Sequence, residues 1–213
     1  MIKKFLSGAV LLATVTLLSS TAHAEINFGS DLVSRYVWRG TDFGDAVSVQ
    51  PGIAYSTGAI EIGAWSSWAL SGSGANENDI YVSFSAGPVG VTITDYFFPT
   101  GVENDFFNYK DEDGIHILEV SASFTTGPMS LMGAFNFLGD GEDSFYLEAG
   151  YGLGEMDGIE VGLAAGLGNG AYTTDTDPML VNLAVNLAKD DYFASYILNP
   201  DKETIFLVFG KSF

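Results

Sequence analysis

The chain ends in the stretch ETIFLVFGKSF, residues 203–213, an apolar strand-forming run whose last residue is an aromatic. A terminal strand of this kind is typical of outer-membrane β-barrels. A sheet in lipid must close on itself, because an open edge would leave N–H and C=O groups with no water to bond them. We therefore predict that this last strand pairs with the first strand and closes a barrel.

Similar strand-like runs recur along the chain between clusters of Gly, Pro, Asn and Asp. No helical periodicity competes with them over a long window, and no linker divides the chain. We predict an all-β fold, a transmembrane antiparallel β-barrel in one domain of residues 25–213. Its twelve predicted strands are residues 26–38, 46–57, 59–70, 79–86, 89–98, 114–125, 128–138, 143–153, 158–167, 179–188, 191–198 and 203–213.

The connections between these strands alternate in length. Those after even-numbered strands are tight, as at Gly58, Gly87-Pro88 and Gly127, whereas those after odd-numbered strands are longer, as at Ser71 to Asn78 and Pro99 to Asp113. Bacterial barrels have an even number of strands, short periplasmic turns and longer outward loops. The alternation therefore predicts that both chain ends face the periplasm.

Residues 1–24 have the pattern of a secretory signal peptide. Lys3 and Lys4 precede an apolar run, and Ala22-His23-Ala24 offers small residues at a cleavage site. We expect cleavage after Ala24 and export to the cell outer membrane. No later segment supplies the roughly 20 apolar residues of a spanning helix.

Composition narrows the functional classes. The net charge of −19 disfavours a nucleic-acid partner, since phosphate binding needs Lys and Arg. The chain has no Cys, which excludes disulfides and thiolate metal sites. The high Gly and aromatic content, in short apolar pieces, suits a membrane barrel better than a soluble secreted domain.

Several predicted strands alternate with period two. In 143–153, Leu147 and Tyr151 share one face with other apolar residues, while Tyr146 and Glu148 share the other face with glycines. Residues 158–167 and 179–188 follow the same pattern. Apolar side chains facing lipid and polar or small ones facing the lumen are expected of a barrel.

The first strand contains the sequence SRYVWRG, residues 34–40. Together with Gln50-Pro51-Gly52 and the sequence GAWSS at residues 63–67, it resembles the TorF-like family of proposed porins. The resemblance implies a small outer-membrane barrel with a passive-transport role. Arg35 and Arg39 are the positions that match the family motif.

Arg35 and Arg39 are an even number of residues apart, so they are expected to share one strand face about 13 Å apart. Tyr36 and Trp38 would then face lipid, and both arginines the lumen. Candidate lumen carboxylates on other strands are Glu61, Glu119, Glu148 and Glu160. These charges predict either a constriction that selects solutes or an ion-pair network that fills a narrow barrel, and both can hold together.

The predicted outward loops are acidic, and we expect them to draw cations to the barrel mouth. A calcium loop is not expected at Lys110 to Gly114, because the distal bidentate Glu is lacking. The loop carboxylates are Asp42, Asp45, Glu77, Glu103, Asp105, Asp111, Glu112, Asp113, Asp140, Glu142, Asp175, Asp177 and Asp201.

Enzyme activity is not expected. His116 is the one histidine after the predicted cleavage site, and no serine motif accompanies it. We therefore expect no catalytic residues, no cofactor and no metal site. We expect Phe213 to belong to the signal read by the barrel-assembly machinery.

The function expected from the sequence is a narrow porin-like channel for small ions or solutes with a moderate cation preference. Its expected partners are outer-membrane lipids, the assembly machinery and the solutes themselves. The alternatives are a non-conducting structural or adhesive barrel and, less favoured, a lipid-modifying enzyme.

Overall fold

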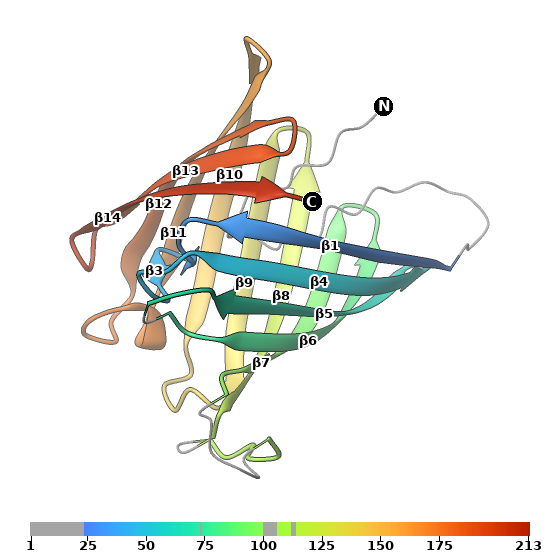
Figure 1. Ribbon diagram of the computed structural model, residues 1–213. Helices are drawn as coiled ribbons and strands as arrows, with labels where there is room; N and C mark the ends of the chain where they lie inside the picture. The colour runs from blue at the N-terminus through green and yellow to red at the C-terminus, as the bar shows by residue number, and fades with distance from the viewer. Residues whose placement is uncertain (1–23, 73, 100–105, 112–113) are drawn as a thin grey trace.

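A computed structural model describes residues 24–72, 74–99, 106–111 and 114–213. Within them, twelve antiparallel strands form a closed barrel in the order β1-β14-β13-β12-β11-β10-β9-β8-β7-β6-β5-β4 (Figure 1). This confirms the predicted fold class. The predicted signal peptide, apart from Ala24, lies outside the described residues.

The barrel strands are close to those expected from the sequence. They are β1 (Glu25–Val33), β4 (Ser48–Thr57), β5 (Ile60–Ala69), β6 (Glu77–Ala86), β7 (Val89–Phe97), β8 (His116–Thr126), β9 (Met129–Leu138), β10 (Phe145–Met156), β11 (Ile159–Gly168), β12 (Met179–Lys189), β13 (Tyr192–Asn199) and β14 (Thr204–Ser212). Strand β1 is the main exception, because it ends at Val33 and not at residue 38.

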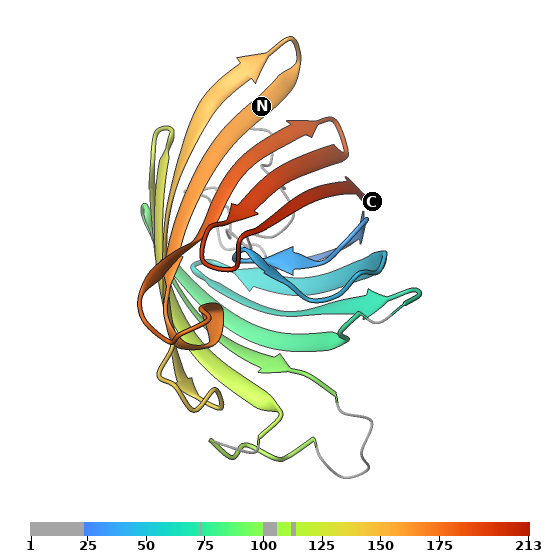
Figure 2. The ribbon, with the colours of Figure 1, turned by 90° about the vertical axis from the view of Figure 1, so that its left-hand side faces the viewer.

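Tight two-residue turns join alternate strand pairs. Gly58, Gly87 and Gly127 begin three of these turns with φ of 59°, 62° and 55°. A two-residue hairpin whose first residue has positive φ favours glycine there, because its twist matches that of the strands. The hairpin of β10 and β11 is long and projects beyond its neighbours (Figure 2).

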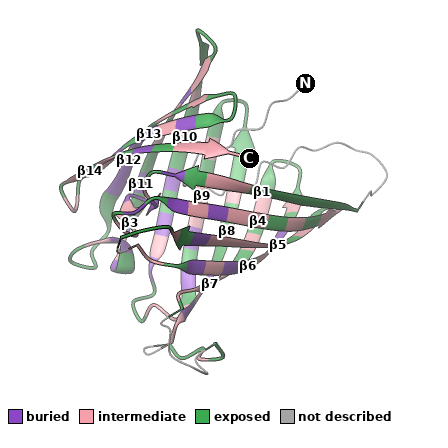
Figure 3. Cartoon of the chain, in the orientation of Figure 1, coloured by how far each residue is buried: buried purple, intermediate pink, exposed green. Residues whose placement is uncertain are grey.

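Side chains alternate across the barrel wall. Large apolar residues on the outer face are exposed, among them Phe28, Ile80, Leu147 and Leu207, each more than half exposed. Polar residues such as Ser67, Asn136 and Ser195 are buried on the inner face. Figure 3 shows this burial alternating with exposure along the strands. The inner face of the barrel wall therefore carries many buried polar residues, and the outer face is apolar.

Strands β1 and β14 close the barrel, as the terminal sequence predicts. Their register pairs Asp31 with Ser212 and Val33 with Gly210. The N–H of Phe213 continues the seam by donating to the carbonyl of Ser30 at 2.9 Å. The Phe213 side chain is 72% exposed, so it contributes little packing.

The chain between β1 and β4 turns into the barrel. Residues 34–47, called the lumen hairpin below, contain the short strands β2 (Val37–Trp38) and β3 (Thr41–Asp42), which pair only with each other. Tyr36 and Val37 are almost fully buried there. The expected strand 26–38 was therefore wrong in its second half.

Among the described residues, no helix has the length and apolar character required to cross a membrane. The one helical segment described is η1 (Gly170–Tyr172), a single 3-10 turn in the connection between β11 and β12.

Candidate functional site

The lumen hairpin has a tight turn at its tip. Val37 pairs with Asp42 and Trp38 with Thr41, which leaves Arg39 and Gly40 as the two turn residues. Both have positive φ, 49° and 75°. A two-residue turn of this type places its tip residues in the left-handed region, which costs energy for a residue other than glycine. Contacts made by Arg39 must therefore hold it in place.

Gly40 fits closely against the opposite wall. A Cβ atom at this position would lie 1.9 Å from the carbonyl oxygen of Val181 in β12. The Gly40 carbonyl accepts a 3.0 Å hydrogen bond from Nδ2 of Asn199, which is fully buried at the end of β13. No residue larger than glycine fits at position 40 without moving β12.

Arg39 forms the centre of the site. Its guanidinium makes a two-pronged ion pair with Glu119 of β8, with Nη1 2.5 Å from Oε2 and Nη2 3.0 Å from Oε1. Nη1 also donates to the Tyr172 hydroxyl at 2.5 Å. The guanidinium carbon lies 4.1 Å from the ring centre of Trp38 and 4.7 Å from that of Tyr146. Charge-assisted bidentate bonding and cation–π contact both favour this one orientation.

Burial makes this ion pair important for the hairpin. The side chain of Arg39 is 6% exposed and that of Glu119 2% exposed. Two buried charges are tolerated only when each has its partner, because solvation by water has been lost. Glu119 also accepts a hydrogen bond from Tyr96 at 3.1 Å. The pair therefore fixes the hairpin tip to β8.

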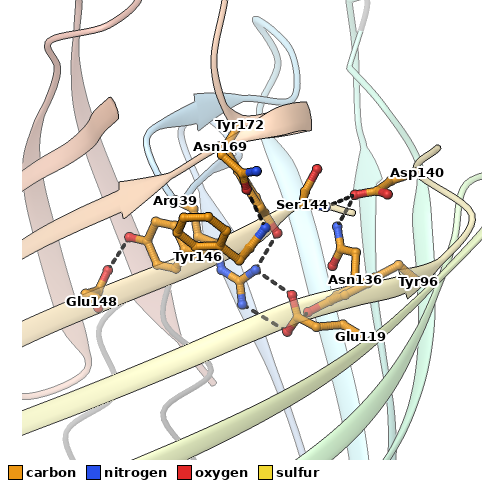
Figure 4. A network of polar contacts seen from close by, with 11 residues as sticks. Arg39, Tyr96, Glu119, Asn136, Asp140, Ser144, Tyr146, Glu148, Asn169 and Tyr172 are labelled. Atoms are coloured by element: carbon orange, nitrogen blue, oxygen red, sulfur yellow. Dashed lines mark hydrogen bonds and ion pairs between the residues drawn. The ribbon is translucent and has the colours of Figure 1, made fainter. Parts of the chain in front are cut away.

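A second carboxylate of the site, Glu148, lies on β10, two strands along the barrel wall from Glu119 (Figure 4). Glu148 of β10 accepts a 2.6 Å hydrogen bond from the Tyr146 hydroxyl and a 3.1 Å hydrogen bond from Nδ2 of Asn182. The Tyr146 ring also contacts the Arg39 guanidinium. Glu148 is thus linked to Arg39 through an aromatic ring and not through a direct ion pair.

Residues in the connections that follow β9 and β11 hold this network in place. Asp140 accepts hydrogen bonds from Nδ2 of Asn136 and from the N–H groups of Glu142 and Ser144. Burial by itself raises the pKa of Asp140, but these donors and the Ser144 hydroxyl bring the pKa below its usual value of 3.8. Burial raises the pKa of Tyr172 to about 12, while Arg39 acts in the opposite direction. The Tyr172 hydroxyl therefore keeps its proton at neutral pH.

The remaining contacts of the hairpin are aromatic and apolar. The Tyr36 ring stacks on Phe43 at 4.8 Å and lies 5.7 Å from the ring of Trp65 in β5. Trp38 lies 5.3 Å from the Tyr96 ring. Val37 joins a buried cluster with Ala184, Ile197 and Val208 from β12, β13 and β14. The expectation that Tyr36 and Trp38 face lipid was therefore wrong, because contacts within the lumen bury Tyr36 almost fully and Trp38 partly.

A cavity of about 440 Å³ lies in the barrel beside the hairpin. Arg35 and Arg39 form part of its boundary, with Asp79, Glu119 and Glu148 on the wall. Small and polar side chains line much of the remainder, including Ser83, Thr92, Thr94, Ser121 and Ser123. The lumen is thus a space of mixed polar and apolar lining that the pinned hairpin narrows.

The structure separates the two arginines. Arg35 and Arg39 do not share a face of the first strand, because both belong to the lumen hairpin. Arg35 pairs with Asp42 at 3.1 Å and with Asp45, and its side chain is 27% exposed. Asp42 and Asp45 therefore belong to the hairpin, where both pair with Arg35, although the Asp45 side chain is 83% exposed.

The predicted carboxylates fall into two groups. Glu119 and Glu148 belong to the network of Figure 4. Glu61 is inward but remote from it, and accepts hydrogen bonds from Ser56 at 2.8 Å and Tyr81 at 3.0 Å. Glu160 lies at the turn end of β11, opposite Glu155, and joins no hydrogen bond of this network within the described chain.

Glu77 corrects another expectation from the sequence. It was expected in an outward loop, but it begins β6 and is 1% exposed on the inner wall. Glu103, Asp105, Glu112 and Asp113 lie outside the described residues. The sequence did not predict three residues of the site, Tyr146, Tyr172 and Asn199. The signal that could have found them was the presence of aromatic and amide residues near the strand ends.

His116 lies at the loop end of β8, where Phe97, Phe106 and Tyr109 surround its ring. Its Nδ1 is 2.7 Å from the Asp95 carboxylate and its Nε2 is 2.6 Å from the carbonyl oxygen of Phe106. Both ring nitrogens are therefore occupied. Within the described residues, no group of three or more His, Asp or Glu side chains is arranged to hold a metal ion.

Comparisons with known proteins give a family. The sequence profile of a bacterial family of unknown function, Gcw_chp, matches residues 19–191. The chain belongs to this family. No curated protein matches the chain. Among solved structures, a multiply substituted mutant of the Rh. blastica porin is similar with a TM-score of 0.36 and 13% identity, over 90% of this chain and 99% of the porin chain.

Proposed function

We propose that this protein is an outer-membrane channel for the passive diffusion of small ions or solutes. The observation that carries the proposal is the lumen, in which a cavity of about 440 Å³ with both polar and apolar lining adjoins the hairpin pinned by Arg39 and Glu119. A barrel of twelve strands is intermediate between eight-stranded barrels filled by side chains and wide porins. The hairpin would act as the constriction.

Several features support the membrane location. The outer wall exposes large apolar side chains on nearly every strand, a pattern that lipid would cover. The alternation of tight turns and longer loops agrees with periplasmic chain ends. The proposal includes export through a signal peptide that is cut after Ala24, followed by assembly by the barrel machinery. It also includes contact with outer-membrane lipids and a relationship to the TorF-like family.

A moderate cation preference is part of the proposal. Arg39 is paired with Glu119, and Arg35 with Asp42 and Asp45. Asp31 and Glu148 border the cavity without an ion pair to a basic side chain in the described chain. An excess of one charge sign in a narrow, poorly hydrated space attracts counter-ions.

Planar-bilayer recording tests the channel. We expect the purified protein to conduct, and a variant in which a Gly-Ser linker replaces residues 35–45 to conduct more. In a potassium chloride gradient, the reversal potential should indicate cation preference. Anion selectivity would refute the preference, and silence of both proteins would refute the channel.

The second candidate is a non-conducting barrel with a structural or adhesive role. It is favoured by the burial of the lumen hairpin, whose Val37 is 2% exposed inside the barrel. A silent wild-type protein together with a conducting hairpin-replaced variant would support this candidate. A lipid-modifying enzyme is the least favoured alternative, and comparing lipase activity of the wild type with His116→Ala would test it.

A further inference from the structure

Two carboxylates lie side by side on the inner wall, away from Arg39. Glu77 and Asp79 are successive inward residues of β6, 1% and 6% exposed. The Glu77 carboxyl lies close to both the Asp79 carboxyl and the Tyr36 hydroxyl of the lumen hairpin. The backbone N–H of Phe97 lies close to the Asp79 carboxyl, which also borders the lumen cavity.

No basic side chain neutralises this pair within the described chain. The ion pairs of Arg35, Arg39 and His116 are all made with other carboxylates. Two carboxylates in contact and out of water cannot both carry their negative charge without a positive partner. The pair therefore requires either a proton or a metal cation.

A shared proton does not satisfy all the oxygens. It relieves the repulsion between the two carboxyl groups, but Glu77 Oε2 and Asp79 Oδ1 are both buried and have no hydrogen-bond partner among the described residues. A buried polar atom without a partner is unfavourable and needs an explanation. A cation bound by these oxygens supplies the missing partner and the missing charge together.

We propose that Glu77 and Asp79 form a binding site for a hard divalent cation of the calcium class. The side chains named here offer only carboxyl and hydroxyl oxygens as metal ligands, and calcium prefers oxygen ligands over nitrogen or sulfur. The Tyr36 hydroxyl lies close to Glu77, and Ser67, fully buried, is the register partner of Glu77 on β5. The cation would join the hairpin, through Tyr36, to the wall formed by β5 and β6.

The site is expected to be weak. It offers two carboxylates and no third acidic or histidine ligand among the described residues, so water from the adjoining cavity must complete the shell. Calcium sites with few charged ligands bind with dissociation constants of roughly 0.1–1 mM. Binding here does not require an open channel, so the proposal goes beyond the proposed function and is independent of it.

Terbium luminescence tests the site on the purified full-length mature protein in detergent. Trp65 is the register partner of Asp79, and its ring lies 5.7 Å from that of Tyr36, so both rings can sensitise a terbium ion bound at the pair. We expect saturable sensitised emission that calcium displaces. Acidic loops also bind terbium. The variants below therefore identify the part of the terbium emission that arises from the Glu77–Asp79 pair.

Glu77→Gln and Asp79→Asn keep the shapes of the side chains but remove one charge each. Each should weaken the calcium-displaceable component at least about tenfold, while Asp157→Asn, in an exposed turn, should leave it unchanged. Trp65→Phe should lower the emission amplitude without changing the midpoint. Equal titrations of the wild type, Glu77→Gln and Asp79→Asn would overturn the proposal.

A second measurement covers variants that assemble poorly. Calcium at millimolar concentration should raise the thermal midpoint of the wild-type protein, and magnesium should raise it less because it retains its water ligands. Tyr36→Phe, which loses one hydroxyl and no charge, should show a smaller calcium shift. A wild-type midpoint indifferent to calcium up to 10 mM, about ten times the weakest expected dissociation constant, would also overturn the proposal.

Discussion

Replacing Arg39 with Met tests how firmly the lumen hairpin is held. The change removes the partner of Glu119, which is 2% exposed and keeps only the Tyr96 hydroxyl as a donor. Removing one partner of a buried ion pair costs about 3–5 kcal/mol, because a charge is left unpaired in a dry site. We expect the free energy of unfolding to fall by that amount.

Arg35→Met is the matched control, since Arg35 lies in the same hairpin but its side chain is 27% exposed, and its partners Asp42 and Asp45 have side chains that are 28% and 83% exposed. Exposed ion pairs contribute less than about 1 kcal/mol, so this variant should be nearly neutral. The double variant Arg39→Met/Glu119→Leu leaves no unpaired charge. We expect it to recover about 2 kcal/mol relative to Arg39→Met alone.

The assay is urea unfolding in lipid vesicles, followed by tryptophan fluorescence. The dependence of the free energy on urea should be the same for all variants, so that midpoints can be compared. Equal losses for Arg39→Met and Arg35→Met would refute the reasoning. Failure of the double variant to recover stability would show that the ion pair is not the source of the effect.

Three further outcomes are expected. Asp140 has a lowered pKa, so it stabilises the fold above its usual value of 3.8 and loses that effect as the pH falls through its lower folded value. The difference in thermal midpoint between the wild type and Asp140→Asn should therefore shrink from pH 5 to pH 2, and a constant difference would contradict this. Deleting Phe213, which is 72% exposed, should leave the purified barrel nearly as stable but lower its surface level, whereas normal levels would argue against an assembly role. An epitope tag at Asp175 should be labelled on intact cells and one at Gly127 should not, and reversed labelling would refute the topology.

The sequence predicts the wall of the barrel well because the wall follows simple rules. Period-two alternation and tight turns such as Gly87-Pro88 depend on near neighbours, and β4 to β14 of the barrel lie within three residues of their expected bounds. The lumen hairpin follows the same local rules, since Val37 and Trp38 do form a short strand. Alternation cannot distinguish a strand in the wall from a hairpin inside it.

The site depends on contacts that local patterns do not encode. Arg39 was expected in the lumen, but its partner could not be chosen among four candidate carboxylates without the fold. Glu77 was assigned to a loop because it follows a Gly- and Asn-rich stretch. The sequence WRGT, residues 38–41, was the missed signal, because a two-residue turn ending in Gly between strand-forming residues predicts a hairpin.

The position of the lumen hairpin constrains the order in which the molecule can form. Its tip residues bond to Glu119, Tyr172 and Asn199, which follow them by 80, 133 and 159 positions in the chain. A chain made from its N-terminus presents the hairpin long before these partners exist. The hairpin can therefore dock only after β13 has been placed. Burial of Trp38 would then report the end of assembly rather than its beginning.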